Sequence, residues 1–432
     1  MIPGGKFSLL RNIGWMGATT GLRLASGMLS FVIVARLLGP VHFGIYMFWM
    51  SVAGLLTLLV NFGFTPLVLR EIGAKPDAAK SLMSEVLTAR AMLGALLLFA
   101  SAVAAMLWLD GMQALLLFCL LFALLADAMT DLFNVGFRAT NRFALETRIA
   151  TATSLLQLLL IAGSTWVWPR LEVAALAFLG SRLLVLALTW LLQRRYFEGV
   201  GLLSRQAGWL RIRKAVSYAA DFGLQSLFGQ IDSLVLNHFL GPVAVGLFQA
   251  GMRLFNGGAQ AASILANVFL PRAARAAGDP AAFAREAGKI QWAFVGTGLA
   301  FGLALALGAG WLVALLFGAA YAGLVDILPW LGLFFFVRFF AASWGIVLTA
   351  AGFQRFRAGC NAIQWLGVLG LAVWLVPRWG VVGWVICVLV GNLFLLLAYA
   401  IRGMRHTGQG AWQPMIASLA ALLFLPYLHL PA

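Results

Sequence analysis

The sequence contains few charged residues, and acidic residues are the scarcer kind. Charged residues make up 10% of the 432 positions, whereas hydrophobic residues make up 62%. A soluble domain carries about a quarter charged residues, so this composition excludes an ordinary soluble protein. Apolar runs longer than about 18 residues recur, and each is long enough to cross a bilayer as a helix. The runs are continuous and not alternating, which disfavours transmembrane strands. The predicted fold class is an all-α polytopic membrane protein.

The sequence also lacks the signatures of several catalytic classes. Its three cysteines, Cys119, Cys360 and Cys387, have neither metal-ligand nor disulfide spacing, and we interpret them as small apolar residues. The sequence contains no GxxxxGK[ST] phosphate-binding loop, no HExxH zinc motif and no catalytic Ser/His/Asp grouping. The loops predicted to lie outside are short. We therefore expect a membrane transporter and not an enzyme, with no cofactor and no metal.

The apolar runs predict twelve spans and one further apolar segment, which gives about 12–14 transmembrane helices. The spans lie near residues 12–38, 43–69, 82–109, 113–137, 149–168, 173–193, 215–240, 245–270, 290–317, 323–350, 361–376 and 380–401, and the further segment covers 413–430.

These spans divide the chain into two six-helix lobes. We assign 1–200 to an N-terminal lobe, 201–214 to a cytoplasmic linker, 215–402 to a C-terminal lobe and 403–432 to an extra transmembrane or re-entrant segment. Within and beside the linker, residues 203–214 mix Trp, Leu and Ile with basic residues, as interfacial helices do. An ordinary positively charged linker explains that composition equally well.

Basic residues are distributed unevenly over the predicted loops. The chain has 30 Lys and Arg against 14 Asp and Glu, a net charge of +16. With the N-terminus in the cytoplasm, the inner segments hold 22 basic residues and the outer loops hold two. That asymmetry is a strong positive-inside signal. It also gives the positive charge a partner, the anionic lipids at the cytoplasmic face, so nucleic acid is not expected as one.

One short sequence that contains a Gly-Pro turn occurs twice in similar form. The sequence LGPVHFG begins at Leu38 and LGPVAVG begins at Leu240, an offset of 202 residues. Six predicted spans separate the two Gly-Pro turns, so both turns lie on the same, outer side. This arrangement predicts a parallel internal repeat, in which two lobes are related by an axis along the membrane normal.

Polar residues form stripes inside several spans. In the eighth span, Gln249, Arg253, Asn256 and Gln260 recur at steps of three and four, which places them on one helical face. Further charged and polar candidates lie in other spans: Arg23, Arg90, Asp127, Asp131, Asp221, Gln225, Asp232 and Arg338. Such groups can act as hydrogen-bonding glue between helices. Taken together they exceed what helix packing needs, and they predict a central hydrated cavity between the lobes.

We assign roles to these residues by their chemistry. Arginine suits phosphate because its planar fork donates two parallel hydrogen bonds and it stays charged. The candidates for binding a substrate's diphosphate or sugars are Arg23, Arg253, Arg90, Arg338, Gln249, Asn256, Gln260 and Gln225. The candidates for cavity or ion-coupling acids are Asp127, Asp131, Asp221 and Asp232.

The sequence over 35–73, ARLLGPVHFGIYMFWMSVAGLLTLLVNFGFTPLVLREIG, resembles the start of the polysaccharide flippases. These proteins belong to the multidrug/oligosaccharidyl-lipid/polysaccharide (MOP) exporter superfamily. The second LGPxxxGxF turn and the arginine-containing segments at 136–143 and 352–358 are similar as well. The resemblance extends over about residues 10–400.

The resemblance implies alternating access by two six-helix lobes in a bacterial inner membrane. The implied substrate is an undecaprenyl-diphosphate-linked oligosaccharide, moved to the outer leaflet for surface polysaccharides such as the O-antigen of lipopolysaccharide. In the related lipid II flippases, arginines of the first and eighth spans are thought to meet the diphosphate; Arg23 and Arg253 lie on those spans here. We expect a monomer that works with glycan polymerases or ligases.

Two alternatives stay open at this point. A multidrug cation antiporter of the same superfamily would favour an acidic cavity, and the in-span charges are nearly balanced. A membrane glycan ligase or polymerase would need a large outer loop, which the sequence does not contain.

Overall fold

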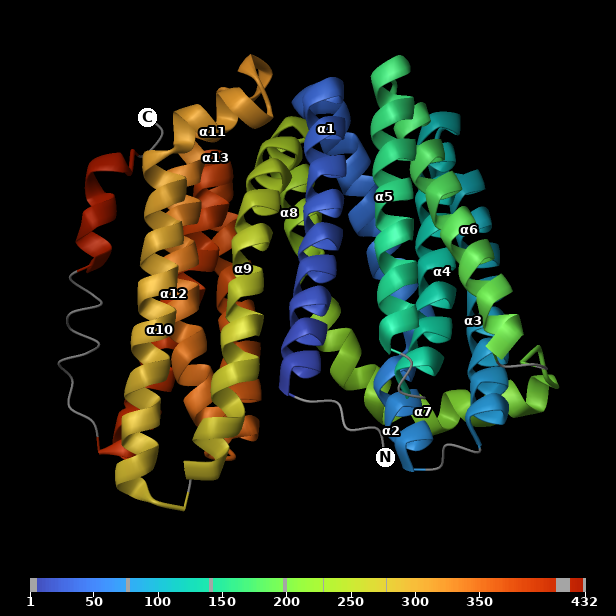
Figure 1. Cartoon of the computed structure of the whole chain (residues 1–432). Coiled ribbons are helices and arrows are strands. Elements are labelled where there is room, and N and C mark those ends of the chain that lie inside the picture. The colour runs from blue at the N-terminus through green and yellow to red at the C-terminus, as the bar shows by residue number, and fades with distance from the viewer. Residues whose placement is uncertain are drawn as a thin grey trace. The chain divides into compact units, whose positions relative to one another are not determined.

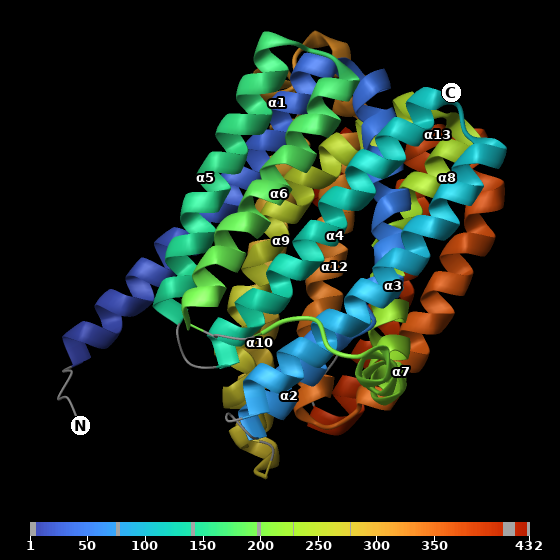
Figure 2. The same cartoon turned by 90° about the vertical axis from the view of Figure 1, so that its right-hand side faces the viewer.

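The structure is a computed structural model. It describes residues 6–74, 78–139, 143–196, 200–227, 229–276, 278–408 and 420–429. Within these ranges the chain forms helices joined by short turns, and no strand occurs (Figures 1 and 2). The prediction of an all-α membrane protein is confirmed.

The chain folds into two compact units. The first comprises Met1–Leu38 and Ile45–Leu234, and the second comprises Gly39–Gly44 and Val235–Ala432. The first Gly-Pro turn therefore belongs to the second unit, although the chain on both sides of it belongs to the first. The boundaries of the predicted lobes themselves stay a prediction.

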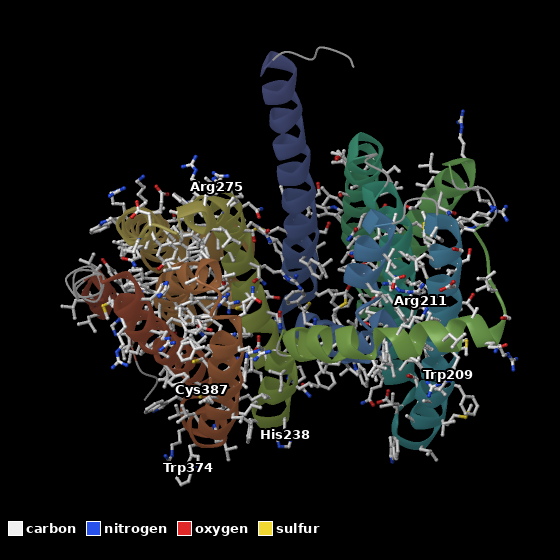
Figure 3. All side chains as sticks on the ribbon, turned by 90° about the horizontal axis from the view of Figure 1, so that it is seen from below. Trp209, Arg211, His238, Arg275, Trp374 and Cys387 are labelled. Carbon is white, nitrogen blue, oxygen red and sulfur yellow. The ribbon has the colours of Figure 1, made fainter. Side chains whose placement is uncertain are left out.

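The first unit is a helical bundle with one crosswise helix. Its elements are α1 (Lys6–Asn61, interrupted at Gly39), α2 (Phe64–Ala74), α3 (Ala79–Trp108), α4 (Gly111–Ala139), α5 (Phe143–Val167), α6 (Leu171–Tyr196), α7 (Arg205–Leu227) and the start of α8 (Ile231–Leu240). Helix α6 packs against α4 and α5, and α2 packs against α4. Helix α7 packs on α3 and lies across its direction (Figure 3).

The second unit is built around a central aromatic helix. Its elements are α9 (Pro242–Ala276), α10 (Pro280–Leu307), α11 (Ala309–Leu316), the 3-10 turn η2 (Ala319–Tyr321), α12 (Leu324–Ala350), α13 (Gln354–Thr407) and the 3-10 segment η3 (Leu422–Tyr427). Helix α12 packs against α9, α10 and α13. Its Phe335 stacks on Phe339, with 4.3 Å between ring centroids, and meets Phe255 of α9 at 5.0 Å.

Eight described segments are long and apolar enough to cross a membrane. Two of these segments are longer than a single membrane crossing requires. Ala25–Asn61 is interrupted at Gly39, and Gln354–Thr407 is interrupted at Trp379 and Gly380. At about 1.5 Å per residue, the 54 residues of the second are far longer than the roughly 30 Å hydrocarbon core. Each interruption coincides with a boundary between two predicted spans.

Three predicted spans are interrupted where we expected continuous helix. The breaks divide 43–69 at Phe62 and Gly63, 215–240 between α7 and α8, and 290–317 at Gly308. At the first break Phe62 and Gly63 adopt φ of 43° and 67°, which a helix does not allow. Hydropathy depends on the side chains of an apolar run and not on its backbone angles, so it could not predict these breaks.

The extra C-terminal segment predicted over 413–430 is described only from residue 420. There Phe424 is fully buried and stacks on Phe336 of α12, with 6.1 Å between ring centroids. The Trp330 indole donates a hydrogen bond to the His429 carbonyl at 3.1 Å. The described end of the chain therefore packs against α12 as a short 3-10 segment. Residues 409–419 lie outside the described part, so the expected transmembrane or re-entrant topology stays a prediction.

The repeated Gly-Pro phrase has a direct structural reason. Gly39 and Gly241 adopt φ of 71° and 80°, left-handed values that glycine reaches without strain. The second glycines of the two phrases serve a different purpose. A Cβ at Gly44 would overlap the carbonyl of Pro242, and a Cβ at Gly246 would overlap the carbonyl of Pro40. Each copy of the turn thus presses its proline backbone against the glycine of the other copy.

We predict that this reciprocal contact tolerates no side chain. Gly44→Ala and Gly246→Ala should each destabilise the protein by about 1–3 kcal/mol, because the obstructing atoms are backbone and cannot rotate away. Gly163→Ala in α5 is the matched control, since nothing lies within 4 Å of its added Cβ. Thermal unfolding of the purified protein measures the difference. Wild-type melting of both crossing variants would contradict the prediction.

Candidate functional site

The polar stripe of α9 lies opposite the face by which the helix packs. The packing face includes the buried residues Gly251, Leu254, Phe255 and Gly258, with Gly251 against Leu331 of α12 and Gly258 against Phe301 of α10. About 180° away, at roughly 100° per residue, lie the predicted site residues: Gln249 and Arg253 are half-buried, and Asn256 and Gln260 are exposed. The stripe therefore lies off the face that packs against α10 and α12.

Arg338 has an exposed side chain on α12, a helix that is otherwise mostly buried. Most of α12 around it is core, including Phe334, Phe335 and Phe339, yet Arg338 itself is exposed. Its guanidinium carbon lies 6.0 Å from the ring centroid of Phe255 in α9 and 5.9 Å from that of Phe334. These aromatic faces give the cation a weakly attractive support. Arg338 is thus held at the surface of the second unit, beside α9.

Arg90 is placed differently, because it is fully buried inside the first unit. Its Nη1 donates to the Ala128 carbonyl of α4, and its Nη2 lies 3.4 Å from Thr65 Oγ1 of α2. The Thr65 hydroxyl donates in turn to Asp131 Oδ2 at 2.7 Å. Arg90 therefore joins α3 to α2 and α4. In this conformation its contacts are internal, and a role in substrate binding stays a prediction.

Asp127 forms an ion pair with Arg182 between α4 and α6. The distance from Asp127 Oδ1 to Arg182 Nη1 is 2.8 Å, and the Arg182 guanidinium also lies 5.0 Å from the Phe178 ring centroid. The Asp127 side chain remains 47% exposed. The carboxylate is thus paired with a cation and still accessible, and the coupling role expected for it stays a prediction.

The remaining predicted residues are described less fully. The side chains of Arg23, Asp221 and Gln225 lie outside the described part of the chain. Asp232 is half-buried in the first turn of α8, where a carboxylate is favoured by the helix dipole. Among the described residues, no three His, Cys, Asp or Glu side chains form a group that could hold a metal ion.

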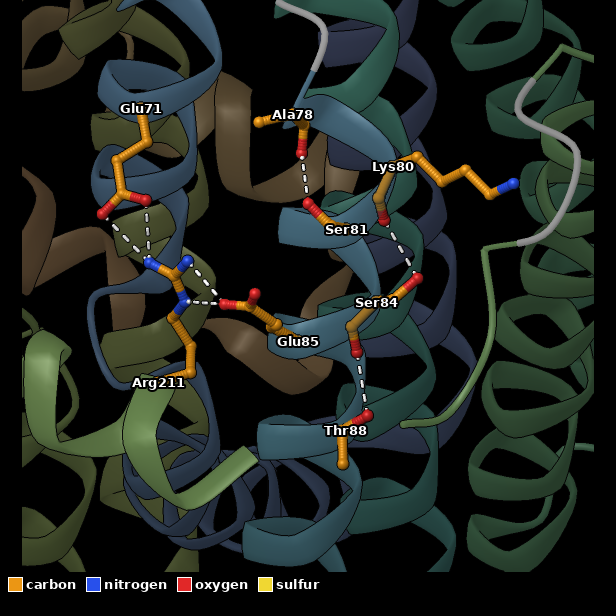
Figure 4. A network of polar contacts seen from close by, with 8 residues as sticks. All are labelled: Glu71, Ala78, Lys80, Ser81, Ser84, Glu85, Thr88 and Arg211. Atoms are coloured by element: carbon orange, nitrogen blue, oxygen red, sulfur yellow. Dashed lines mark hydrogen bonds and ion pairs between the residues drawn. The ribbon is translucent and has the colours of Figure 1, made fainter. Parts of the chain in front are cut away.

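Sequence reasoning missed the strongest ion-pair cluster of the first unit. Arg211 of α7 is 4% exposed and makes hydrogen bonds to two carboxylates (Figure 4). Its Nη1 contacts both oxygens of Glu71, at 2.9 and 3.0 Å, and its Nη2 and Nε contact Glu85 Oε2, at 2.7 and 3.0 Å. In the sequence, Glu85 lies inside the predicted span 82–109, and Arg211 is one of the basic residues of 203–214. The helical spacing of Gly208, Arg211, Ile212 and Ala215 could have revealed a buried face.

Comparison with known proteins agrees with this architecture. Residues 9–276 match the family described as "Polysaccharide biosynthesis protein". The chain belongs to this family. The match covers more than half of the sequence. It includes the first Gly-Pro turn, Arg211 with Glu71 and Glu85, and all of α9. A comparison with curated proteins gives no match.

Solved structures of membrane transporters share this fold. The lipid II flippase MurJ, in an inward closed conformation, has a TM-score of 0.71 at 11% identity, with 95% of this chain and 97% of that chain covered. An inward-facing multidrug resistance MATE transporter of the MOP superfamily has a TM-score of 0.61 at 18% identity, covering 92% and 95%. A Vibrio cholerae MATE transporter has a TM-score of 0.55 at 18% identity, covering 97% of each chain. At these identities the likeness shows the fold alone.

The two arginines Arg90 and Arg338 should respond differently to truncation. Arg90→Ala removes a fully buried cation that donates to the Ala128 carbonyl and to the half-buried Thr65 hydroxyl and that faces Asp131, so we expect a loss of about 3–5 kcal/mol. Arg338→Ala should cost less, under about 1 kcal/mol, because the side chain is exposed and its aromatic contacts lie at the surface of the unit. Thermal unfolding in detergent compares the two variants. Equal losses of stability in the two variants would contradict the prediction that the buried arginine contributes more than the exposed one.

Proposed function

We propose that this protein is a flippase for an undecaprenyl-diphosphate-linked oligosaccharide. It moves this carrier from the cytoplasmic to the outer leaflet of a bacterial inner membrane by alternating access, in the assembly of a surface polysaccharide such as an O-antigen. Its N-terminus lies in the cytoplasm. It acts as a monomer and hands its substrate to glycan polymerases or ligases.

The observation that carries the proposal is the outward polar face of α9. Asn256 and Gln260 are exposed and Gln249 and Arg253 are half-buried, all on the side away from the unit's core. In hydrocarbon a polar side chain, and above all an arginine, is costly unless polar groups surround it. A run of such side chains along one face of a long membrane helix suits a face that a polar ligand can reach, and a sugar-bearing head group is such a ligand.

The substrate's two chemical parts suit two kinds of residue. Arg253 and Arg338, together with Arg23, provide permanent cations for the diphosphate, since guanidinium forks bind phosphate oxygens in pairs. Gln249, Asn256, Gln260 and Gln225 provide amides, which can donate to and accept from sugar hydroxyls. Membership in a polysaccharide biosynthesis family supports the sugar component.

The acids are proposed as sites where transport couples to an ion gradient. Asp127 has an accessible carboxylate paired with Arg182, and Asp131 accepts a hydrogen bond from Thr65, which lies beside Arg90. Protonation of Asp127 would weaken its pairing with Arg182 and loosen α4 from α6. Asp221 and Asp232 are further candidates at the start of the second half of the chain.

A multidrug antiporter is the alternative with a structural neighbour, since several similar folds are MATE transporters. It would require acids at the binding face, whereas the described stripe of α9 carries one arginine and amides. A drug-susceptibility panel on a deletion strain separates the two functions. If the protein is a flippase, the deletion strain should keep its drug susceptibility and lose its surface glycan.

We predict that Arg253→Ala and Arg23→Ala each slow flipping at least tenfold while the protein still inserts and folds. Each substitution removes the charge-assisted hydrogen bonds from one guanidinium to phosphate. Their loss, roughly 1.5–3 kcal/mol, corresponds to a 10- to 100-fold slower translocation. The assay reconstitutes purified protein in liposomes with a fluorescent lipid-linked oligosaccharide and measures its exposure to an external glycosidase.

Arg285→Ala is the matched control, because Arg285 is exposed in the first half of α10 and lies off the polar stripe. It should keep the wild-type rate. Wild-type flipping by both Arg253→Ala and Arg23→Ala would refute the assigned roles. Folded wild-type protein with no flipping of any polyprenyl-diphosphate oligosaccharide would refute the function itself.

A further inference from the structure

Helix α7 is fixed to the first unit by one face. Gly208 lies against Met92 and Thr88 of α3, close enough that any side chain there would collide. Just before the helix, the Leu203 amide donates to the Thr88 hydroxyl at 2.8 Å. Arg211 adds its bidentate contacts to Glu71 and Glu85 on the same side. Hydrogen bonds and close packing together set how the helix is rotated about its own axis.

The opposite side of α7 is apolar and basic at once. Trp209 and Leu210 are 56% and 50% exposed. Arg205, Arg213 and Lys214 are exposed beside them. Ordinary solvated helix faces carry charge without large apolar groups, and core faces carry apolar groups without charge. A face that exposes both is typical of helices that lie at the level of lipid headgroups.

The direction of α7 matches that interpretation. Figure 2 shows the helix nearly end-on and Figure 3 shows it lengthwise, while α3 and α4 run up the bundle in Figure 1. Helix α7 thus lies crosswise to the membrane-spanning helix α3 on which it packs. A helix perpendicular to its spanning neighbours lies parallel to the bilayer plane, and its outward face meets the headgroup region along its length.

We propose that the outer face of α7 is a binding surface for the anionic phospholipids of the cytoplasmic leaflet. Arg205, Arg213 and Lys214 contact phosphate oxygens, and Trp209 and Leu210 enter the boundary between headgroups and acyl chains. Arg211 does not take part, since its charge is balanced by Glu71 and Glu85. Its role is to hold α7 with the basic and apolar residues outward. This surface is independent of the substrate proposed above.

A single labelled position tests where the face lies. The three native cysteines are buried, so Trp209→Cys in the full-length protein can carry a thiol-reactive bimane selectively. In nanodiscs of phosphatidylcholine and phosphatidylglycerol, the label should be quenched more by a lipid with a nitroxide near its headgroup than by aqueous iodide. Leu366→Cys, at a 73% exposed site within α13, is the reference for a lipid-facing position. Stronger quenching by iodide would overturn the proposal.

Charge neutralisation tests the lipid preference. Wild-type protein should melt at a higher temperature in nanodiscs with phosphatidylglycerol than in nanodiscs of phosphatidylcholine alone. The triple variant R205Q/R213Q/K214Q should lose at least half of that shift. The matched triple R272Q/R275Q/R285Q removes the same charge from exposed positions of the second unit and should keep the shift.

Two outcomes would overturn the assignment. Equal losses in both triple variants would show that total charge, and not α7, attracts the lipid. An unchanged shift in R205Q/R213Q/K214Q would show that the basic residues of α7 do not contact it. Arg211→Gln adds a separate check: it should change the quenching of the label at position 209, because the helix loses the contacts that set its rotation.

Discussion

The cost of a charge in hydrocarbon governs how this chain uses its arginines. A guanidinium within a membrane helix needs carboxylates, carbonyls or water around it. In the first unit Arg90, Arg182 and Arg211 meet that need internally, with carbonyl, hydroxyl and carboxylate partners on other helices. In the second unit, Arg338 is exposed and Arg253 lies on the side of α9 away from the core. The first group joins the helices of its unit, and the proposed function assigns the second group to the ligand.

A second constraint comes from the duplicated turn. Gly39 and Gly241 adopt positive φ at the two turns, and the glycines five residues later, Gly246 and Gly44, allow the backbones of Pro40 and Pro242 respectively to approach them closely. Such crossings of small residues are a common way to join membrane helices, because no side chain separates the backbones and weak Cα–H···O contacts can form. Because the contact is reciprocal, neither copy can change alone, and this explains why both phrases keep the same spacing.

Sequence periodicity predicted what depends on side-chain pattern. It located the helices, the repeat and the face of α9, since spacing of three and four fixes which residues share a face. It failed where backbone angles decide, as at Phe62 and Gly63. It also failed where partners are distant in sequence: nothing local to Arg211 indicates that Glu71 and Glu85 surround it. Arg90 and Arg338 looked alike in the sequence, and only packing separates them.

The separation of packing face from polar face on α9 has a consequence for how the protein can evolve. Gly251, Leu254, Phe255 and Gly258 make the contacts that hold α9 to α10 and α12, and none belongs to the stripe. Substitutions at Gln249, Asn256 or Gln260 therefore change the chemistry offered to a ligand with little effect on the fold. Under the proposed function, different sugars would be distinguished by side chains that lie off the packed face of α9.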